Sequence, residues 1–412
     1  MSTGTWLTEK RLRAHALLLG LTMWSIYAWM LATPTLRDRY GNLKGTDFLH
    51  FYTLGCVARE HRGSDLYATN AQAAIATKRV PDAAGIRYLP LYPPQVSILF
   101  APFSRLSYGW ALAAWWILSA LIYAACCHAV WLLCPALRVQ RTTILLAAIA
   151  FPPFFHLIAW GQTSALALIC FTAMFVFLQK RREFLVGIAL GCLIVKPQLA
   201  LAAAVVFIAI GSWRILIGAA LSATAQLALG ILYYGIQPLQ HWFETLWRIR
   251  SVLPLLEPRP YQTHCLRTFW TMLIPWPSAA FTLYAISAIV ILAVTIAVWR
   301  RTATPLSLRY SMLLLSTVLV SPHLTVYDLV VLAPVLLLTA DWLVQQPVTP
   351  PTRHMASLLY LIYALPLFGP LARWTHLQLS VIAMTALMYL IYREASNRNL
   401  SASGKRLAHA DS

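Results

Sequence analysis

Apolar runs long enough to cross a lipid bilayer recur along the whole of this 412-residue chain. The hydrocarbon core of a bilayer is about 30 Å thick, so a helix needs roughly twenty mostly apolar residues to span it. Hydrophobic residues make up 59% of the sequence and charged residues only 11%, which is typical of a membrane domain. The sequence therefore predicts an all-α polytopic membrane protein with a single membrane domain over 1–393.

The first apolar run follows three basic residues, Lys10, Arg11 and Arg13, as it would in a signal peptide. No small-residue cleavage site is evident and more apolar runs follow, so we expect an uncleaved first helix. The seven cysteines form no Cys-x-x-Cys pair, which argues against a zinc site or a disulfide framework. Only Cys56 and Cys265 are expected in outer loops, where a disulfide would join the two loops.

Short loops rich in Lys and Arg mark the cytoplasmic side of a membrane protein, and this rule orients about twelve spans with both termini inside. The cytoplasmic loops include Lys180-Arg181-Arg182 and Arg300-Arg301. The spans are predicted at 14–33, 108–133, 142–158, 163–179, 184–195, 199–211, 215–235, 278–299, 308–320, 325–340, 355–370 and 377–392. Loops 34–107 and 236–277 then lie outside, and a disordered tail over 394–412 lies inside.

Region 92–104 is apolar but short, so we expect a juxtamembrane or re-entrant helix that starts at Tyr92-Pro93-Pro94. As a full span it would invert every later loop and place Lys180-Arg181-Arg182 outside. The net charge of +19 follows from this distribution of basic loops, so membrane lipids are expected as partners and nucleic acid is not.

This topology places the unusual polar residues of the span ends on one face of the membrane. Polar groups near membrane depth are costly and usually mark a site. The prolines after Tyr92 and Lys196 indicate bent helix ends of the kind that line a cavity. We therefore expect a cavity open to the outer water and to lipid, with these candidates: Asp47, His50, Tyr52, Tyr92, Gln95, Gln162, Lys196, Gln198, His264, His323, Tyr327 and Asp328.

The most informative stretch is 46–52, which reads Thr-Asp-Phe-Leu-His-Phe-Tyr. Asp47 and His50 are three residues apart, so a helix would place them on one face. An acid between aromatic residues beside a membrane can act as a general base, with His50 one turn away to tune it. The alternative is a helix N-terminus capped by Thr46 or Asp47. Both readings stay open on these seven residues.

A set of short motifs in a fixed order resembles glycosyltransferase family 87. The motifs are Asp47-Phe48 with Tyr52, Gly63-Ser64-Asp65-Leu66-Tyr67, Tyr92-Pro93-Pro94, Pro102, Gly161-Gln162, Lys196-Pro197, Ser321-Pro322-His323 and Tyr327-Asp328. They run from Asp47 to Asp328. The family consists of membrane enzymes of the GT-C type, related to α-1,2-mannosyltransferases that use polyprenyl-phosphate mannose.

The resemblance implies transfer of a sugar, with mannose as the expected one, from a polyprenyl-phosphate donor to a lipid or glycan acceptor. It places the reaction at the outer, periplasmic face of a bacterial cytoplasmic membrane. Asp47 matches the acidic residue that activates the acceptor hydroxyl. One carboxylate without a second nucleophile favours direct, inverting displacement, and cations can stabilise the leaving phosphate. Another GT-C transferase, for a pentose or aminosugar, remains the nearest alternative.

Several candidates have a structural alternative. Lys196 could extend its ammonium to the interface, His264 could be a solvated loop residue, and Arg248 and Arg250 could contact lipid headgroups. His323 could pair with Asp328, which is also the rival base. Gln95, Gln162 and Gln198 could bind sugar hydroxyls or cap broken helices, and Asp65 is better explained as a turn former.

Two other classes of function fit a polytopic chain. A secondary transporter also uses broken helices, but its polar groups lie at mid-membrane between matching halves, and no such halves are evident here. A channel or lipid-binding scaffold is the other alternative. No Asp-x-Asp occurs and the outer carboxylates are dispersed, so no cofactor is predicted and the use of a divalent metal is left open.

Overall fold

The computed structural model describes residues 8–249, 257 and 259–410, and in these residues it contains helices and no strands. The only extended pairings in the described residues are two isolated bridges, Arg37–Leu43 and Thr263–Thr325. The predicted all-α class is therefore confirmed.

The chain begins with α1 (Glu9–Leu31). The segment 34–107, which the sequence predicts as an outer loop, contains α2 (Phe48–Arg59), α3 (Thr69–Arg79) and α4 (Gln95–Phe100), which we call the outer-loop helices. The middle contains α5 (Tyr108–Leu132), α6 (Arg141–Ile149), α7 (Pro152–Trp160), α8 (Ser164–Gln179), α9 (Glu183–Gly191), α10 (Pro197–Ala209), α11 (Trp213–Tyr234) and α12 (Gln237–Trp247). The last part contains α14 (Leu266–Leu273), α15 (Pro277–Arg300), α16 (Leu306–Val320), α17 (Ala333–Val344), α18 (Pro350–Ala364), α19 (Ala372–Thr375) and α20 (Leu379–Ala410).

Short 3₁₀ helices join these elements. They are η1 (Gly63–Tyr67), η2 (Pro81–Ala83), η3 (Phe103–Arg105), η4 (Pro135–Gln140), η5 (Cys192–Val195), η6 (Pro260–Gln262), η7 (Val326–Leu332) and η8 (Leu365–Leu371). Asp65 lies in η1 and pairs with Arg62 at 2.5 Å, as a turn residue does.

Among the described residues, six helical segments are long and apolar enough to cross a membrane: α1, α5, α11, α15, Val326–Val344 and Pro350–Thr375. The pair α6 and α7, bent by 43°, makes a seventh if it is one span. Four further helices are also apolar but shorter: Ser164–Gln179, Glu183–Val195, Pro197–Ala209 and Leu306–Val320. The chain is therefore a multispan membrane protein, while a total of about twelve spans stays a prediction.

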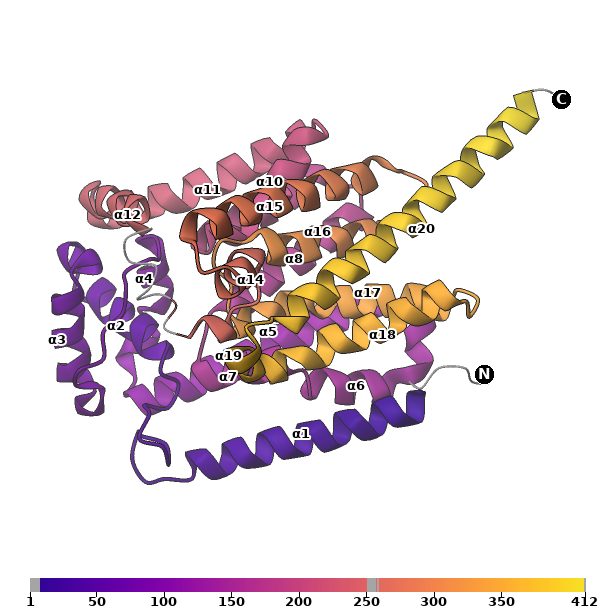
Figure 1. Cartoon of the computed structure of the whole chain (residues 1–412). Coiled ribbons are helices and arrows are strands. Elements are labelled where there is room, and N and C mark those ends of the chain that lie inside the picture. Colours follow the sequence, from indigo (N-terminus) through magenta and orange to yellow (C-terminus); the bar gives the residue numbers. More distant parts are fainter. Residues whose placement is uncertain (1–7, 250–256, 258, 411–412) are drawn as a thin grey trace.

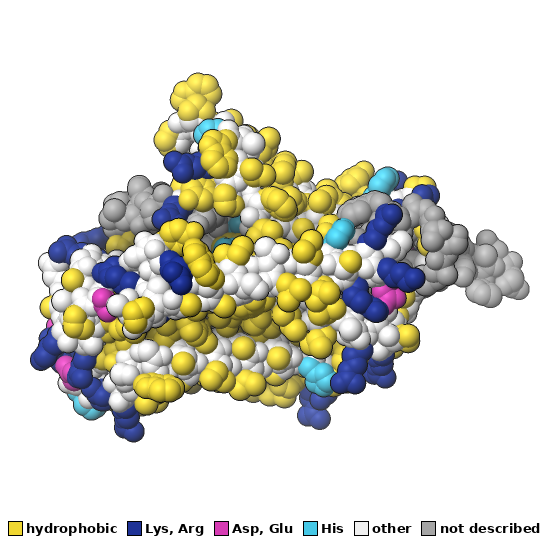
Figure 2. Space-filling view, turned by 90° about the horizontal axis from the view of Figure 1, so that it is seen from below, with side chains coloured by type: hydrophobic (Ala, Val, Ile, Leu, Met, Phe, Trp, Pro, Cys, Tyr) yellow, Lys and Arg dark blue, Asp and Glu magenta, His cyan; other side chains and the backbone are white. Residues whose placement is uncertain are grey.

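The outward faces of the long helices are apolar, as a lipid environment requires. Leu18 on α1, Leu121 on α5 and Ile289 on α15 are all more than 60% exposed. Figure 2 shows a broad hydrophobic face, with Lys and Arg side chains gathered toward its two ends. In this protein lipid, and not water, is the solvent for that face.

The long helices lie roughly side by side, and the helices α2, α3, α4 and α12 gather at one end of the bundle (Figure 1). Both chain ends lie at the opposite end of the bundle, as the predicted common side of the termini requires. The predicted juxtamembrane helix in 92–104 is α4, followed by η3.

The outer-loop helices have a hydrophobic core of their own, distinct from the core of the bundle. The Phe48 ring stacks on Trp115 of α5, and Phe51 stacks on Phe100 of α4 with centroids 4.9 Å apart. Gly55 permits the α2–α4 contact, because a Cβ there would lie 2.3 Å from the Phe100 carbonyl oxygen. Helix α2 is thus fixed against both α4 and α5, and with it the start of the helix at Asp47.

One sequence prediction differs from the structure, and the structure decides one possibility that the sequence left open. Residues 394–410, expected as a disordered tail, continue α20 as a helix, since Ala395 is buried and Arg398 bonds Glu394 and Gln346. The disulfide between Cys56 and Cys265 is not formed, because Cys56 is buried in the outer-loop core and Cys265 in the bundle core.

Candidate functional site

Asp47 lies at the start of α2 and its side chain makes no capping bond. Its carboxylate instead accepts a 2.7 Å hydrogen bond from Gln162 Nε2. Its backbone N–H donates to the Trp160 carbonyl oxygen at 3.0 Å. Gly161 makes this contact possible: it has a φ of +69°, and a Cβ there would lie 2.7 Å from Phe48 Cβ. The capping alternative is therefore wrong for the Asp47 side chain.

Lys196 and Asp328 form a buried ion pair, with Nζ 2.7 Å from Oδ1 and both side chains no more than 5% exposed. Ser164 joins the pair, since its Oγ lies 3.0 Å from Lys196 Nζ and donates to Asp328 Oδ1 at 2.6 Å. The backbone N–H and hydroxyl of Thr325 occupy the other Asp328 oxygen. Lys196 therefore does not extend to the interface, and a carboxylate so fully bonded is poorly suited to act as a base.

Tyr327 connects the Asp47 contact to this ion pair. Gln162 Nε2 lies 3.2 Å from the Tyr327 hydroxyl as well as 2.7 Å from Asp47. The Lys196 ammonium lies 5.3 Å from the centre of the Tyr327 ring, within cation–π range. Asp47, Gln162, Tyr327, Lys196 and Asp328 thus form one connected group, which we call the central cluster. Gln162 orients Asp47 through its amide nitrogen, and its amide oxygen accepts the backbone N–H of Thr163 at the start of α8.

Burial raises the pKa of Asp47 to about 6, and the hydrogen bond from Gln162 and the charge of Lys196 hold it below a still higher value. The nearby Asp328 charge acts in the raising direction. A carboxylate with a pKa near the working pH combines the ionised form with appreciable basicity. The geometry thus gives Asp47 the properties of a general base.

His50 does not tune Asp47 as expected. The described residues provide no hydrogen-bond partner for either of its buried ring nitrogens. Burial lowers its pKa to about 4, so the ring is neutral at pH 7. Its neighbours are the rings of Tyr88 and Tyr92, with centroids 5.2 and 5.8 Å away. His50 therefore lies beside the base without contributing charge to it.

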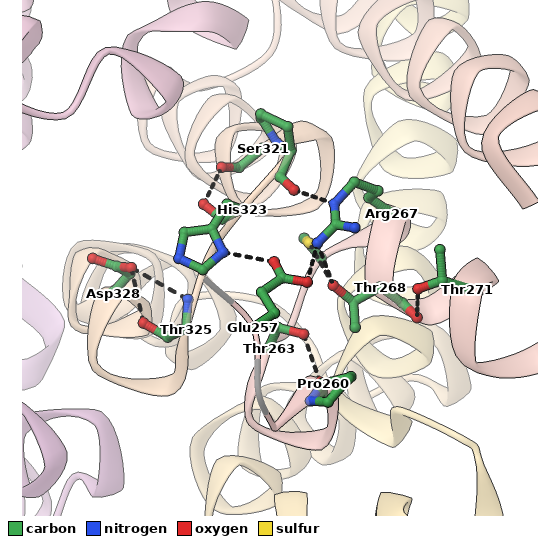
Figure 3. A network of polar contacts seen from close by, with 12 residues as sticks. Glu257, Pro260, Thr263, Arg267, Thr268, Thr271, Ser321, His323, Thr325 and Asp328 are labelled. Atoms are coloured by element: carbon green, nitrogen blue, oxygen red, sulfur yellow. Dashed lines mark hydrogen bonds and ion pairs between the residues drawn. The ribbon is translucent and has the colours of Figure 1, made fainter. Parts of the chain in front are cut away.

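His323 has a different partner from the expected Asp328. Its Nδ1 lies 2.6 Å from Glu257 Oε1, and the other oxygen of Glu257 pairs with Arg267. Arg267 also donates to the Pro322 carbonyl oxygen. Figure 3 shows Glu257 between the His323 ring and the Arg267 guanidinium. Burial raises the Glu257 pKa, but the His323 hydrogen bond and Arg267 charge outweigh it and lower the pKa overall.

Sequence reasoning missed the role of Glu257 and the supporting hydroxyls of Ser164 and Thr325. A usable signal existed for Glu257 alone: it and Glu244 are the only acids in the basic loop 236–277. Arg267 is not the only basic residue of that loop. Arg250 lies outside the described residues, and Arg259 is exposed.

Besides His50 and His323, four more predicted site residues lie outside the central cluster. His264 is buried against Ser380, 2.7 Å away, and burial lowers its pKa to about 3, so it is neither a cation nor a solvated loop residue. The Tyr52 hydroxyl donates to the Leu106 carbonyl oxygen and supports the outer-loop core. Gln198, in the first turn of α10, makes none of the cluster contacts. The side-chain amide atoms of Gln95 are buried without a partner among the described residues.

The model of glycosyltransferase family 87 matches residues 91–322 of the chain. The chain belongs to glycosyltransferase family 87. No curated protein and no solved structure matches it. Membership in a glycosyltransferase family sets aside the transporter and channel alternatives. The matched range contains Gln162 and Lys196, and Asp47 lies before it.

A family 87 glycosyltransferase needs a sugar donor and a hydroxyl acceptor. Within the described residues no three His, Cys, Asp or Glu side chains gather in a way that could hold a metal ion. The carboxylates of the site are instead engaged with amide, ammonium, guanidinium or imidazole groups.

Proposed function

We propose that this enzyme transfers mannose from a polyprenyl-phosphate donor to a hydroxyl of a lipid or glycan acceptor, with inversion at the anomeric carbon. The reaction takes place at the outer face of a bacterial cytoplasmic membrane. The observation that supports this proposal best is the partly buried Asp47 carboxylate, whose pKa is raised to about 6 and which is oriented by Gln162.

Asp47 takes the proton of the acceptor hydroxyl as that oxygen attacks the anomeric carbon. The bond between that carbon and the phosphate oxygen breaks, and the phosphate leaves with the electron pair. Asp328 is the other carboxylate of the central cluster, and Lys196, Ser164 and Thr325 occupy its oxygens. It is therefore not free to act as a nucleophile, and a single displacement with inversion is the simplest course.

The donor phosphate needs cationic hydrogen-bond donors, because charge develops on it as the glycosidic bond breaks. An ammonium has three N–H groups, and Lys196 has two oxygen partners, on Ser164 and Asp328. The third N–H is available for a phosphate oxygen. Glu257 accepts a hydrogen bond from His323 Nδ1, and in the imidazolium form of His323 the Nε2–H is the second cationic donor.

The test uses purified protein in lipid nanodiscs with radiolabelled polyprenyl-phosphate mannose and a membrane-lipid extract as acceptor source. Wild-type protein should produce a labelled product with an inverted anomeric centre. Asp47→Asn should lose about two orders of magnitude or more in turnover, the usual scale for a general base, while still binding the donor.

Near-normal turnover of Asp47→Asn would contradict the assignment of the base. Asp328→Asn separates the two carboxylates: it should lower stability, and at temperatures where it stays folded it should keep more turnover than Asp47→Asn. Transfer from a lipid-phosphate pentose and not from the mannose donor would replace the sugar while leaving the mechanism intact.

A further inference from the structure

His50 is a buried polar side chain without a hydrogen-bond partner among the described residues. It is 4% exposed, and neither ring nitrogen has a hydrogen-bond partner among the described residues. A buried polar group without a partner lowers the stability of the folded state, because it has lost its hydrogen bonds to water. Such groups in native proteins usually have a functional explanation or a missing ligand. The mechanism proposed above does not use the imidazole.

The imidazole borders a narrow slot between α2 and the segment 84–94. The slot is lined by His50, Leu54, Leu66, Tyr67, Pro90, Tyr92, Pro93, Pro94 and Ser97. None of these side chains carries a charge at pH 7, because burial lowers the His50 pKa to about 4. The lining offers aromatic and proline rings together with a neutral donor and acceptor. These groups suit the apolar faces and hydroxyls of a sugar or polyol, and they do not suit a phosphate.

The slot lies next to the central cluster. His50 is one helical turn from Asp47 on α2. The Tyr92 phenol is close enough to Lys196, Asp328 and Asp47 for their charges to act on its pKa, which burial raises. In an inverting displacement the attacking hydroxyl and the leaving phosphate are on opposite sides of the reacting carbon. The uncharged slot therefore belongs to the acceptor side of Asp47, and Lys196 and His323 belong to the phosphate side.

We propose that the His50 slot binds the neutral, hydroxyl-bearing headgroup of the acceptor, and that the imidazole hydrogen-bonds a sugar or polyol hydroxyl there. This inference rests on the proposed function, since it assigns the acceptor side of that reaction. The outer wall, segment 84–94, contains no α-helix and is held by Tyr67 at the Tyr92 carbonyl and by Trp242 at the Leu91 carbonyl. Because the slot is closed to water in this structure, binding of the headgroup requires this segment to move outward.

The test compares His50→Phe with the wild type in nanodiscs. Phenylalanine fills the site without unsatisfied nitrogens, so the thermal midpoint should stay equal or rise while the KM for the lipid acceptor rises tenfold or more. The Kd for the donor should change less than twofold. Thr53→Val is the matched control, because Thr53 is buried on the same helix and its hydroxyl already bonds the Leu49 carbonyl oxygen. Its acceptor KM should not change.

An unchanged acceptor KM in His50→Phe would overturn the proposal and leave a core histidine. A matching rise in the donor Kd would overturn it in favour of a donor-sugar site. If His50→Phe misfolds, His50→Gln, which keeps a donor and an acceptor, is measured in its place and should retain part of the acceptor affinity.

Saturation-transfer NMR with methyl α-mannoside gives a readout free of catalysis. Wild type and Asp47→Asn should both show transfer and His50→Phe should not, even if no donor supports turnover. Absence of transfer to the glycoside in the wild type would also overturn the proposal.

Discussion

At the scale of single residues, the chemistry of the site depends on what burial does to one carboxylate. In the proposed mechanism Asp47 must be ionised to accept a proton, and burial raises its pKa to about 6. We therefore expect kcat/KM to be constant at higher pH and to fall about tenfold per pH unit below pH 6. A pH–rate profile with the purified enzyme measures this directly, and a flat profile between pH 5 and 8 would contradict it.

The same shift has a consequence for stability. Since the folded-state pKa of Asp47 lies above the unfolded value, its contribution to stability is present below the unfolded pKa and is lost as the pH rises through about 6. Asp47→Asn removes this loss. We expect the thermal midpoint of Asp47→Asn to exceed that of the wild type at pH 7.5 and to approach it at pH 4.5. Calorimetry at the two pH values checks the sign.

Under the proposed function, Glu257 positions His323. Glu257→Gln should lower both transfer and stability, because the amide leaves Arg267 and His323 without their carboxylate partner, and removing one partner of a buried charge pair costs about 3–5 kcal/mol. Glu60→Gln is the matched control: Glu60 pairs with Arg79 and Arg62 on the exposed part of the same outer region, where such pairs contribute about 0–1 kcal/mol. A shift in the pH profile of Glu257→Gln, absent in Glu60→Gln, would distinguish positioning from simple destabilisation.

At the scale of elements, the Lys196–Asp328 pair joins the start of α10 to η7. Lys196→Met leaves Asp328 buried and unpaired and should destabilise the protein by about 3–5 kcal/mol. Adding Asp328→Asn should recover most of that stability. Donor affinity should remain weakened in the double variant by about 1.5–3 kcal/mol, because the phosphate contact is still missing. Full recovery of donor binding would assign Lys196 a structural role only.

The turn between α7 and α8 is the second element that sets the site. Gly161→Ala should reduce transfer strongly, because the residue has a φ of +69° and its Cβ would lie 2.7 Å from Phe48 Cβ, displacing Gln162 from Asp47. Gly41→Ala has a similar φ of +80° and open space around it, so it should show only the backbone strain of about 1–3 kcal/mol. Equal effects of the two substitutions on transfer would refute this reasoning.

The sequence identified the elements of the site better than their partners. Asp47, Gln162, Lys196, Tyr327 and Asp328 were all expected at one face, because polar residues at the ends of apolar runs are conspicuous. Their pairing was not predictable, since it depends on side chains more than a hundred residues apart. Glu257 illustrates the limit: it is one of two acids in the basic loop 236–277, but its partner His323 is 66 residues away and cannot be identified from that loop. His264 was a candidate cation of the site, but burial lowers its pKa and makes the ring neutral.

At the scale of the whole molecule, both chain ends lie at the end of the bundle opposite α2–α4. We expect exposed positions near α2–α4 to be reached from outside the cell and those near Arg182 to be reached from the cytoplasm. In a variant without native cysteines, an impermeant thiol reagent should label Ser64→Cys and Lys78→Cys in intact cells and spare Arg182→Cys. Labelling of Arg182→Cys from outside would invert the topology.

The two hydrophobic cores divide the site between them. The outer-loop core contributes α2 and the slot walls, all within residues 43–115. The bundle core surrounds Lys196, Ser164 and Asp328. Under the proposals above, acceptor choice is encoded in one continuous stretch near the N-terminus and donor choice in the remainder. Acceptor specificity and donor specificity can then change independently of each other by mutation. Exchange of the outer-loop segment between related enzymes would redirect the same activated sugar to a new recipient, with no change in the residues that hold the lipid phosphate.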